Sequence, residues 1–324
     1  MPTRRSVILG ASAAAALTLG GRAAAASYRA IPQCPSARVI VDNDFAGDPD
    51  GLVALAHQLL TTKTRTVLVT SSALDPKLLG SAFPQGSAAA GRDVALELIA
   101  RAGISPAPPV IAGSEALGSS PAEPSAAARA IAAEAMRDDP LPLFFTCGGP
   151  LTNLAAALRM EPAIARRMTV IWIGGGAYPK GGWEYNLATD LPAARTVIEQ
   201  SRVPLWQVPQ PAYRQMQASV AELADQLRPI SPFAAWIYDK FTSPPAFVDL
   251  GGSWPMGDSP TVMITAITSE SSTFADRAAR RIKADGSYGA AIPGRTMRVY
   301  ETLDARLTFA DFLALMRLHA KGEI

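Results

Sequence analysis

Residues 38–60 read RVIVDNDFAGDPDGLVALAHQLL. The apolar run Arg38–Val41 predicts a buried β-strand, and Leu52–Leu60 has the apolar spacing of a helix. Four carboxylates, all of them aspartates, stand between these two elements within nine residues: Asp42, Asp44, Asp48 and Asp50. The stretch therefore predicts an acidic loop at the carboxyl end of a strand, which is where open α/β sheets bind their ligands.

The same alternation of strand and helix continues along the chain. Further buried strands are predicted at Thr66–Val69, Leu143–Thr146, Thr169–Ile173 and Leu205–Val208. Helical patterns lie between them at Ser87–Ala102, Ala126–Arg137, Leu151–Arg159 and Pro192–Gln200. We therefore expect an α/β fold with an open, mostly parallel sheet and helices on both faces.

The pattern changes after Gly252. Small β elements are predicted at Ala279–Ile282 and Thr296–Tyr300, on either side of a turn at Asp285-Gly286. A closing helix is predicted at Thr308–Ala320, with Thr308 and Asp311 as its capping box.

Residues 1–26 have the pattern of an export signal. Arg4 and Arg5 precede the weakly apolar stretch Val7–Gly20, and Ala23–Ala26 supplies a small-residue cleavage site. The segment Thr3–Ile8 is similar to a twin-arginine signal, with an ordinary secretory leader as the alternative. We expect a periplasmic or secreted protein whose residues 27–324 form a single domain. No later apolar stretch reaches the length of a membrane helix, so we expect no membrane anchor.

The composition narrows the possible chemistry. A net charge of +2 without a Lys/Arg-rich run gives no sign of a nucleic-acid partner. The chain has two cysteines and two histidines, too few for a usual zinc site or for most Ser-His or Cys-His catalysis. His57 and His319 lie in helical patterns and are interpreted as structural or surface residues. Carboxylate chemistry remains.

The four aspartates after the first strand would repel one another unless a cation lay among them. Oxygen ligands without nearby His or Cys favour calcium or magnesium. The alternative is a polar loop in which the aspartates only cap the following helix and form turns. Four carboxylates directly after a buried strand favour a metal or sugar site.

Four motifs, in order along the chain, resemble the inosine–uridine nucleoside hydrolase family. They are the Asp-rich loop, Gly149–Asn153 (GPLTN), Glu184-Tyr185-Asn186 and Trp254–Asp258. The resemblance implies a calcium-dependent enzyme that hydrolyses the N-glycosidic bond of ribonucleosides, releasing ribose and a free purine or pyrimidine base. It also implies a nucleoside-hydrolase-like sheet and a homo-dimer or homo-tetramer.

The resemblance also implies a metal site. Asp44 would be a calcium ligand and the general base towards a metal-bound water, Asp258 a second carboxylate ligand, and Gly148 the donor of a backbone carbonyl. The family's further aspartate ligand is missing, because Gly51 stands at its position. We expect Asp48 to replace it. Alternatively, Asp258 would only cap a predicted helix, Pro260–Ala266.

For the substrate, the resemblance implies that Asp50 and Asn186 bind the ribose 2′ and 3′ hydroxyls and that Glu184 reaches the 5′ hydroxyl. Aromatic candidates for contact with the base are Tyr178, Trp183, Tyr185 and Trp254.

Two other functions fit parts of the sequence. Asp42-Asn43-Asp44 and Gly257-Asp258 resemble motifs of a haloacid-dehalogenase-type phosphatase, although Ser259–Ile264 lacks the further Asp of its last motif. A non-catalytic nucleoside- or sugar-binding protein of the same fold would keep Glu184 and Asn186 while losing metal ligands, as Gly51 suggests.

Overall fold

The computed structural model describes residues 31–79, 83, 85–118, 124–244 and 251–324. The chain divides into two units, residues 1–32 and 33–324, and every helix and strand described below belongs to the second. The predicted export signal at residues 1–26 lies outside the described residues. A search of the described helices for one long and apolar enough to cross a membrane finds none.

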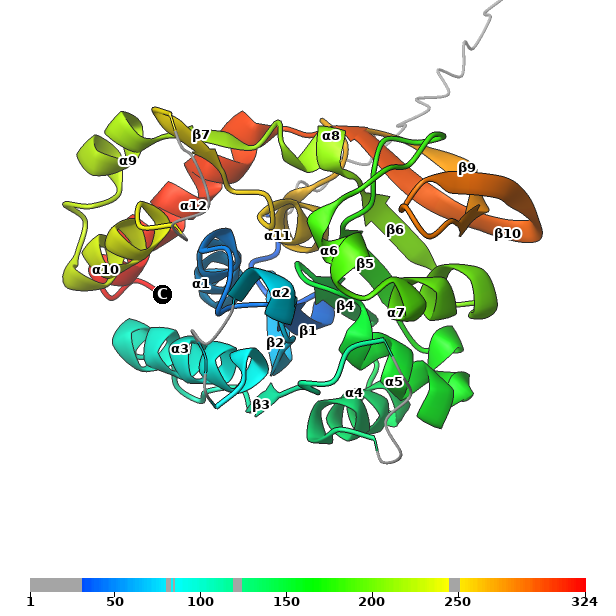
Figure 1. Cartoon of the computed structure of the whole chain (residues 1–324). Helices are drawn as coiled ribbons and strands as arrows, with labels where there is room; N and C mark the ends of the chain where they lie inside the picture. Colours follow the sequence, from blue (N-terminus) through cyan, green and yellow to red (C-terminus); the bar gives the residue numbers. More distant parts are fainter. Residues whose placement is uncertain (1–30, 80–82, 84, 119–123, 245–250) are drawn as a thin grey trace, which may run out of the picture. The chain divides into compact units, whose positions relative to one another are not determined.

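A sheet of eight strands runs through the described residues in the order β3-β2-β1-β4-β5-β6-β10-β9 (Figure 1). The strands are β1 Ala37–Asn43, β2 Thr64–Ser71, β3 Val110–Ala112, β4 Leu143–Cys147, β5 Thr169–Ile173, β6 Leu205–Val208, β9 Thr273–Ile282 and β10 Tyr288–Thr302. Neighbours pair in parallel except for the antiparallel pair β9–β10 at one edge. The predicted open, mostly parallel sheet is confirmed.

The strand order reverses between β1 and β4. From β1 the chain proceeds outward to β2 and β3, and it then returns to β4 and continues in the other direction through β5 and β6. Such a reversal separates the connecting loops on either side and leaves a crevice at the carboxyl ends of the two central strands. Asp42 at the end of β1 pairs with Cys147 at the end of β4, so the acidic loop lies at this point.

Both faces of the sheet are covered, because alternate residues of β1 point to opposite faces. Val39 and Val41 pack with one helical layer, and Ile40 packs with the other. The first layer contains α1 (Asp50–Leu60), α3 (Ser87–Ala102), α10 (Pro232–Phe241) and α12 (Ala305–Ala320). The second contains α4 (Ala126–Met136), α5 (Thr152–Met160) and α7 (Leu191–Arg195), which continues as a π-helical turn, Thr196–Gln200 (Figure 1). Full burial of an aliphatic side chain such as Ile40 stabilises the fold by about 1.5–3 kcal/mol.

Shorter elements complete the fold, and apart from the helical stretch that begins at Pro260 they were not predicted, because they lack the continuous apolar run that marks short strands such as β6. They are α2 Pro76–Leu79, α6 Tyr185–Thr189, α8 Gln210–Tyr213, α9 Val220–Gln226, α11 Pro260–Val262, the 3₁₀ turn Pro162–Arg166, the π-helical turn Met263–Ile267, and the antiparallel pair β7 Gln217–Ser219 and β8 Ser253–Pro255.

The predicted start of the closing helix is wrong by one turn. Helix α12 begins at Ala305, and the Asp304 side chain caps it by accepting a hydrogen bond from the backbone N–H of Leu307 at 2.9 Å. The Thr308 hydroxyl donates to the Asp304 carbonyl, as a residue inside a helix does. Asp311 lies 2.8 Å from His57 Nε2. An aspartate one turn earlier therefore provides the cap that the sequence assigned to Thr308.

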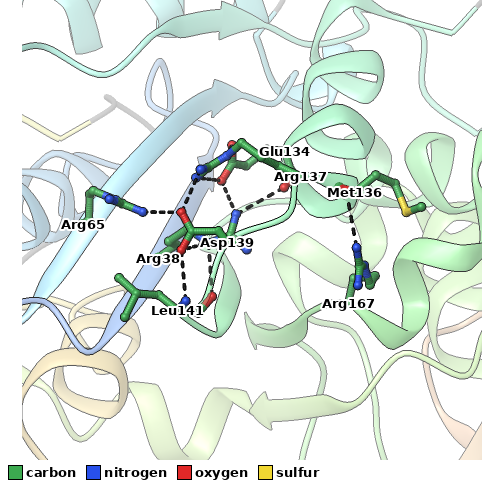
Figure 2. Close-up of polar contacts among 8 residues, drawn as sticks. All are labelled: Arg38, Arg65, Glu134, Met136, Arg137, Asp139, Leu141 and Arg167. Carbon is green, nitrogen blue, oxygen red and sulfur yellow. Dashed lines mark hydrogen bonds and ion pairs between the residues drawn. The ribbon is translucent and has the colours of Figure 1, made fainter.

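An arginine network ties the amino ends of the central strands together (Figure 2). Arg38, at the start of β1, pairs with Glu134 of α4 and lies 3.5 Å from Asp139. Asp139 also pairs with Arg65 of β2 at 2.6 Å and with Arg137 at 2.7 Å. Glu134 and Asp139 therefore link β1 and β2 to α4 and the segment before β4. This link lies at the amino ends of the strands, opposite the acidic loop.

Cys34 and Cys147 are both free thiols. Cys34 precedes the amino end of β1, whereas Cys147 lies buried at the carboxyl end of β4. The two positions are separated by about the length of a strand, roughly 17–20 Å, and a disulfide needs Cα atoms within about 7 Å. We predict that thiol counting on the denatured, unreduced protein finds two free thiols per chain. A count of none with an intact monomer mass would contradict this.

Candidate active site at the ends of β1 and β4

Asp42 anchors the site. Its side chain is 1% exposed and accepts hydrogen bonds from Thr70 Oγ1 at 2.6 Å, Asn153 Nδ2 at 2.8 Å and the Ser72 hydroxyl. Burial raises the pKa of Asp42, and these hydrogen bonds act in the opposite direction. The contacts join the ends of β1 and β2 to the first turn of α5, which contains Asn153 of the GPLTN motif. With its carboxylate occupied in this way, Asp42 is poorly placed to act as a phosphatase nucleophile.

Four further aspartates gather beside this anchor. Asp44 follows β1, Asp48 lies in the loop, Asp50 begins α1, and Asp258 precedes α11. Asp44, Asp50 and Asp258 are buried, and Asp48 is half-buried. Burial, and then the charge of a neighbouring aspartate, raises the pKa of Asp44, Asp48 and Asp50 well above the usual range. Burial also raises the pKa of Asp258, followed by repulsion from Asp44 and Asp48 and opposed by a hydrogen bond from Asn43.

The carboxylates of the arginine network, at the amino ends of the strands, have lowered pKa values, whereas those of the aspartate cluster have raised ones. Burial raises the pKa of Glu134, but hydrogen bonds from Arg137 and Arg38 bring it below its usual value. The backbone N–H of Leu141 and the nearby arginines lower that of Asp139. Among the described residues, no Lys, Arg or His side chain forms an ion pair with any aspartate of the cluster. Negative charge without a protein cation is what a metal-binding or positively charged ligand site requires.

Specific contacts hold the aspartates in place. Asp258 Oδ2 accepts from Asn43 Nδ2 at 2.8 Å, and Asp50 Oδ2 accepts from the backbone N–H of Asp258 at 3.1 Å. Asp48 Oδ1 accepts from the Trp254 indole at 3.2 Å. The Asp258 side chain does not cap α11, whose N-cap residue Ser259 also makes no side-chain bond. Its carboxylate faces the cluster instead.

Gly148 brings the end of β4 against the same carboxylate. Its backbone N–H donates to the Asp42 carbonyl at 3.0 Å, and its own carbonyl accepts from Asn186 Nδ2 at 3.2 Å. A Cβ at this position would lie 2.5 Å from Asp258 Cγ, so only glycine allows this approach. The structure therefore brings Gly148, Asp258 and Asn186 together.

Glu184 is placed as a cap. It is 1% exposed and accepts backbone N–H groups of Gly175 at 2.7 Å and Leu187 at 3.0 Å, together with the Tyr213 hydroxyl at 3.0 Å. Burial raises its pKa, which these hydrogen bonds oppose. Asn186 Nδ2 also donates to the Ile173 carbonyl at 2.9 Å. Two of the three predicted substrate residues, Glu184 and Asn186, are thus held where β5 ends and α6 begins.

The aromatic candidates separate into two groups. Tyr185 begins α6 next to Glu184, and burial, followed by the charges of Asp44 and other aspartates, raises its pKa. Trp254 holds Asp48. Trp183 is 64% exposed, and Tyr178 lies under Arg280 and donates to a β9 carbonyl. The sequence pattern did not identify Tyr213, which reaches Glu184 only through the fold.

Both histidines lie in the layer formed by α1, α3, α10 and α12. His57 Nε2 lies 2.8 Å from Asp311 of α12, and the His57 ring packs beside Phe312. His319 Nε2 lies 2.8 Å from the carbonyl of Ala102, the last residue of α3. Their structural interpretation is consistent with these contacts.

The donor atoms at the site are oxygens, which fit a hard cation, but the carboxylates alone do not surround a single point. Within the described ranges, no three His, Cys, Asp or Glu side chains are arranged to hold a metal ion. The Asn43 carboxamide fills the space beside Gly51, and its Oδ1 atom is buried without a hydrogen-bond partner among the described residues. The carboxylates of Asp44, Asp48 and Asp258, with neutral oxygen donors such as Asn43 Oδ1 and the Gly148 carbonyl, make up a set suited to calcium or magnesium.

Comparison with known proteins identifies relatives over most of the chain. The sequence model of the inosine-uridine preferring nucleoside hydrolases matches residues 39–309. Pyrimidine-specific ribonucleoside hydrolase RihB of Escherichia coli (strain K12 / DH10B) is 46% identical over 61 residues, 18% of this chain and 19% of that protein. The putative pyrimidine-specific ribonucleoside hydrolase RihB of Shigella boydii is 46% identical over 61 residues, 18% of this chain and 25% of that protein. This chain thus matches a quarter or less of these curated relatives.

Solved structures show the same fold. A plant nucleoside hydrolase, PpNRh1, aligns with a TM-score of 0.65 at 18% identity, covering 88% of this chain and 99% of that one. The inosine-uridine preferring nucleoside hydrolase from Bacillus anthracis gives a TM-score of 0.64 at 18% identity, covering 87% and 99%. Because the family match spans the sheet and the four motifs, this chain belongs to the inosine-uridine preferring nucleoside hydrolase family.

Proposed function

We propose that this protein hydrolyses the N-glycosidic bond of ribonucleosides, releasing ribose and a free base, with the help of bound calcium. The observation that carries the proposal is the buried cluster of aspartates at the point where the strand order reverses, which forms no ion pair with a Lys, Arg or His of the described residues. The family match over residues 39–309 supports the reaction. The all-oxygen donor set supports calcium rather than zinc.

The metal-binding residues proposed are Asp44, Asp48 and Asp258, with the carbonyl of Gly148. Calcium accepts many oxygen ligands in flexible geometry, which suits carboxylates that come from separate loops. When bound, the ion supplies Lewis acidity and orients water and sugar oxygens.

The residues of the chain do the remaining work. Asp44, which lies buried at the end of β1, accepts the proton of the attacking water. Asp50, fixed by the Asp258 N–H, binds the ribose hydroxyls together with Asn186. Glu184 binds the 5′ hydroxyl in exchange for its hydrogen bond with the Tyr213 hydroxyl. Carboxylates around the sugar stabilise the positive charge of an oxocarbenium-like transition state.

One assay separates this proposal from its rivals. The purified protein is incubated with calcium, a panel of purine and pyrimidine ribonucleosides, and a generic phosphate ester, and free ribose and phosphate are measured. Ribose release supports the hydrolase. Phosphate without ribose would identify a phosphatase, and neither product, with nucleoside binding by calorimetry, would identify a non-catalytic binder.

The histidines provide a test of the leaving-group chemistry. We predict that His57→Ala and His319→Ala each leave the catalytic rate within several-fold, because neither ring lies at the cluster. His57→Ala should lower stability, since it removes a buried ring, by about 1–3 kcal/mol. Rates are therefore compared per folded protein. A loss of about a hundredfold, the low end for a general acid, would overturn this assignment.

We further propose that residues 1–26 direct export by the twin-arginine route and that the mature protein is a homo-dimer or homo-tetramer that acts on a small-molecule nucleoside. Arg4→Lys with Arg5→Lys should abolish export by this route, whereas an ordinary secretory leader would tolerate two lysines. Cell fractionation of both forms measures the result. Continued export of the double variant would favour the ordinary leader.

A further inference from the structure

Asn43 is the last residue of β1, and its side chain is enclosed by the site. It is 2% exposed. Its Nδ2 donates to Asp258 Oδ2 at 2.8 Å, whereas Oδ1 is buried and has no hydrogen-bond partner in the ranges described. A native structure rarely leaves a buried carbonyl oxygen without a partner, so a missing ligand is a physical reason for this one.

The unpartnered oxygen lies where a side chain of residue 51 would begin. A Cβ on Gly51 would be 2.5 Å from Asn43 Oδ1 and 2.8 Å from Asn43 Cγ. Gly51 is a residue of α1 and is not among the glycines with positive φ, so the backbone does not require glycine there. Glycine is needed for space, because the Asn43 carboxamide occupies it.

Gly51 is also the position at which the family resemblance leads us to expect a carboxylate ligand. The two observations fit together. Residue 51 carries no carboxylate, and a buried amide oxygen of residue 43 lies where the side chain of residue 51 would begin. The Nδ2 atom of the same carboxamide donates to Asp258, and it lies where a Cβ on Gly148 would be.

We propose that Asn43 Oδ1 is a calcium ligand that replaces the carboxylate missing at Gly51, while Nδ2 orients Asp258 for the same ion. This inference rests on the calcium site of the proposed function. At the position of the missing side chain, a neutral oxygen brings one negative charge fewer than a carboxylate would. The affinity of the site then falls, towards the roughly 10⁻⁴–10⁻³ M at which extracellular calcium modules work.

The first experiment uses a property of the sequence. The chain contains three asparagines, Asn43, Asn153 and Asn186, and all three lie at this site. Protein labelled with ¹³C at the asparagine side-chain carbonyl should give three resonances by NMR, and the one lost in Asn43→Asp belongs to Asn43. During a calcium titration, the Asn43 carbonyl should shift in step with saturation and further than the other two. Calcium binding by calorimetry without a shift at Asn43 would overturn the proposal.

The second experiment measures calcium affinity in variants. Asn43→Asp places a carboxylate at the proposed ligand position and should strengthen calcium binding by roughly tenfold or more, whereas Asn43→Ala should weaken it by a similar factor. Asn153→Asp is the matched control, because it adds the same charge beside Asp42 rather than at Gly51. Equal gains from Asn43→Asp and Asn153→Asp would indicate charge alone and would overturn ligation. If a variant does not fold, the NMR titration of the parent protein still decides.

Failure of this inference can be told apart from failure of the proposed reaction, because neither readout needs turnover. Ribose release with an unresponsive Asn43 carbonyl would remove the ligand and leave the hydrolase. A responsive carbonyl without ribose release would keep the ligand and remove the hydrolase. A parent protein that binds no calcium at millimolar concentrations would overturn the ligand assignment together with the calcium site.

Discussion

Replacement of Asp44 by asparagine should reduce ribose release by roughly a thousandfold, within the range of 10²–10⁴ seen when a general base is lost. Asparagine keeps the size and one oxygen of the side chain but cannot accept the proton of the attacking water. Steady-state rates at saturating calcium and nucleoside measure the effect, and calorimetry reports the calcium affinity separately. The matched control is Asp225→Asn on α9, which is exposed and should leave the rate unchanged.

The same variant should stabilise the metal-free protein at neutral pH. Burial, followed by the charge of Asp48, raises the pKa of Asp44 well above 3.8. A carboxylate with a raised pKa in the folded state destabilises that state as pH rises from the unfolded value through the folded one. The gain from Asp44→Asn should therefore be largest at neutral pH and vanish below about pH 3.8. Retention of activity within tenfold, or a loss of neutral-pH stability, would contradict this assignment of Asp44.

Gly51→Asp should destabilise the protein without improving its calcium site. The new Cβ would lie 2.5 Å from Asn43 Oδ1, and overpacking of this kind costs about 1–3 kcal/mol. Combined with Asn43→Ser, which clears the space, the same change supplies a carboxylate in addition to those of Asp44, Asp48 and Asp258. The double variant should bind calcium roughly ten- to a hundredfold more tightly than the parent. Calcium calorimetry and chemical denaturation of the two single variants, the double variant and the parent measure this coupling.

A contrary result would show that the Asn43 side chain does not prevent a carboxylate at residue 51 from binding calcium. Gly51→Asp alone would then bind calcium more tightly at unchanged stability. Asp48 is tested in the same series, because Asp48→Asn should lower calcium affinity about as much as Asp258→Asn if Asp48 is a ligand. The Trp254 indole donates to Oδ1 of the Asp48 carboxylate.

The buried strands and the main helices could be predicted, because continuous apolar runs and helical apolar spacing are visible in the local sequence. Strands β5 and β6 and helix α3 have the predicted bounds. The start of α12 could not be predicted in the same way, since both Asp304 and Thr308 are good caps and only packing decides between them. Short elements such as α8 depend on contacts with distant segments and carry no periodic signal.

Part of the site was accessible from the sequence for a similar reason. Asp44, Asp50 and Gly148 follow recognisable strands, so the parallel sheet brings them to one edge. Asn43 was not identifiable, because its role depends on Gly51 and Asp258, one in the next helix and the other about two hundred residues later. Glu184 matches a motif, but its position as a cap bonded to Tyr213 follows only from the fold.

The most direct test of the account is ribose release from a ribonucleoside by the purified protein in excess calcium, in excess chelator, and after calcium is restored to the chelated sample. We predict release in calcium, loss of release in chelator, and recovery with calcium but not with zinc. Undiminished release in excess chelator would contradict the calcium site, and no release at saturating calcium with any purine or pyrimidine ribonucleoside would contradict the proposed reaction itself.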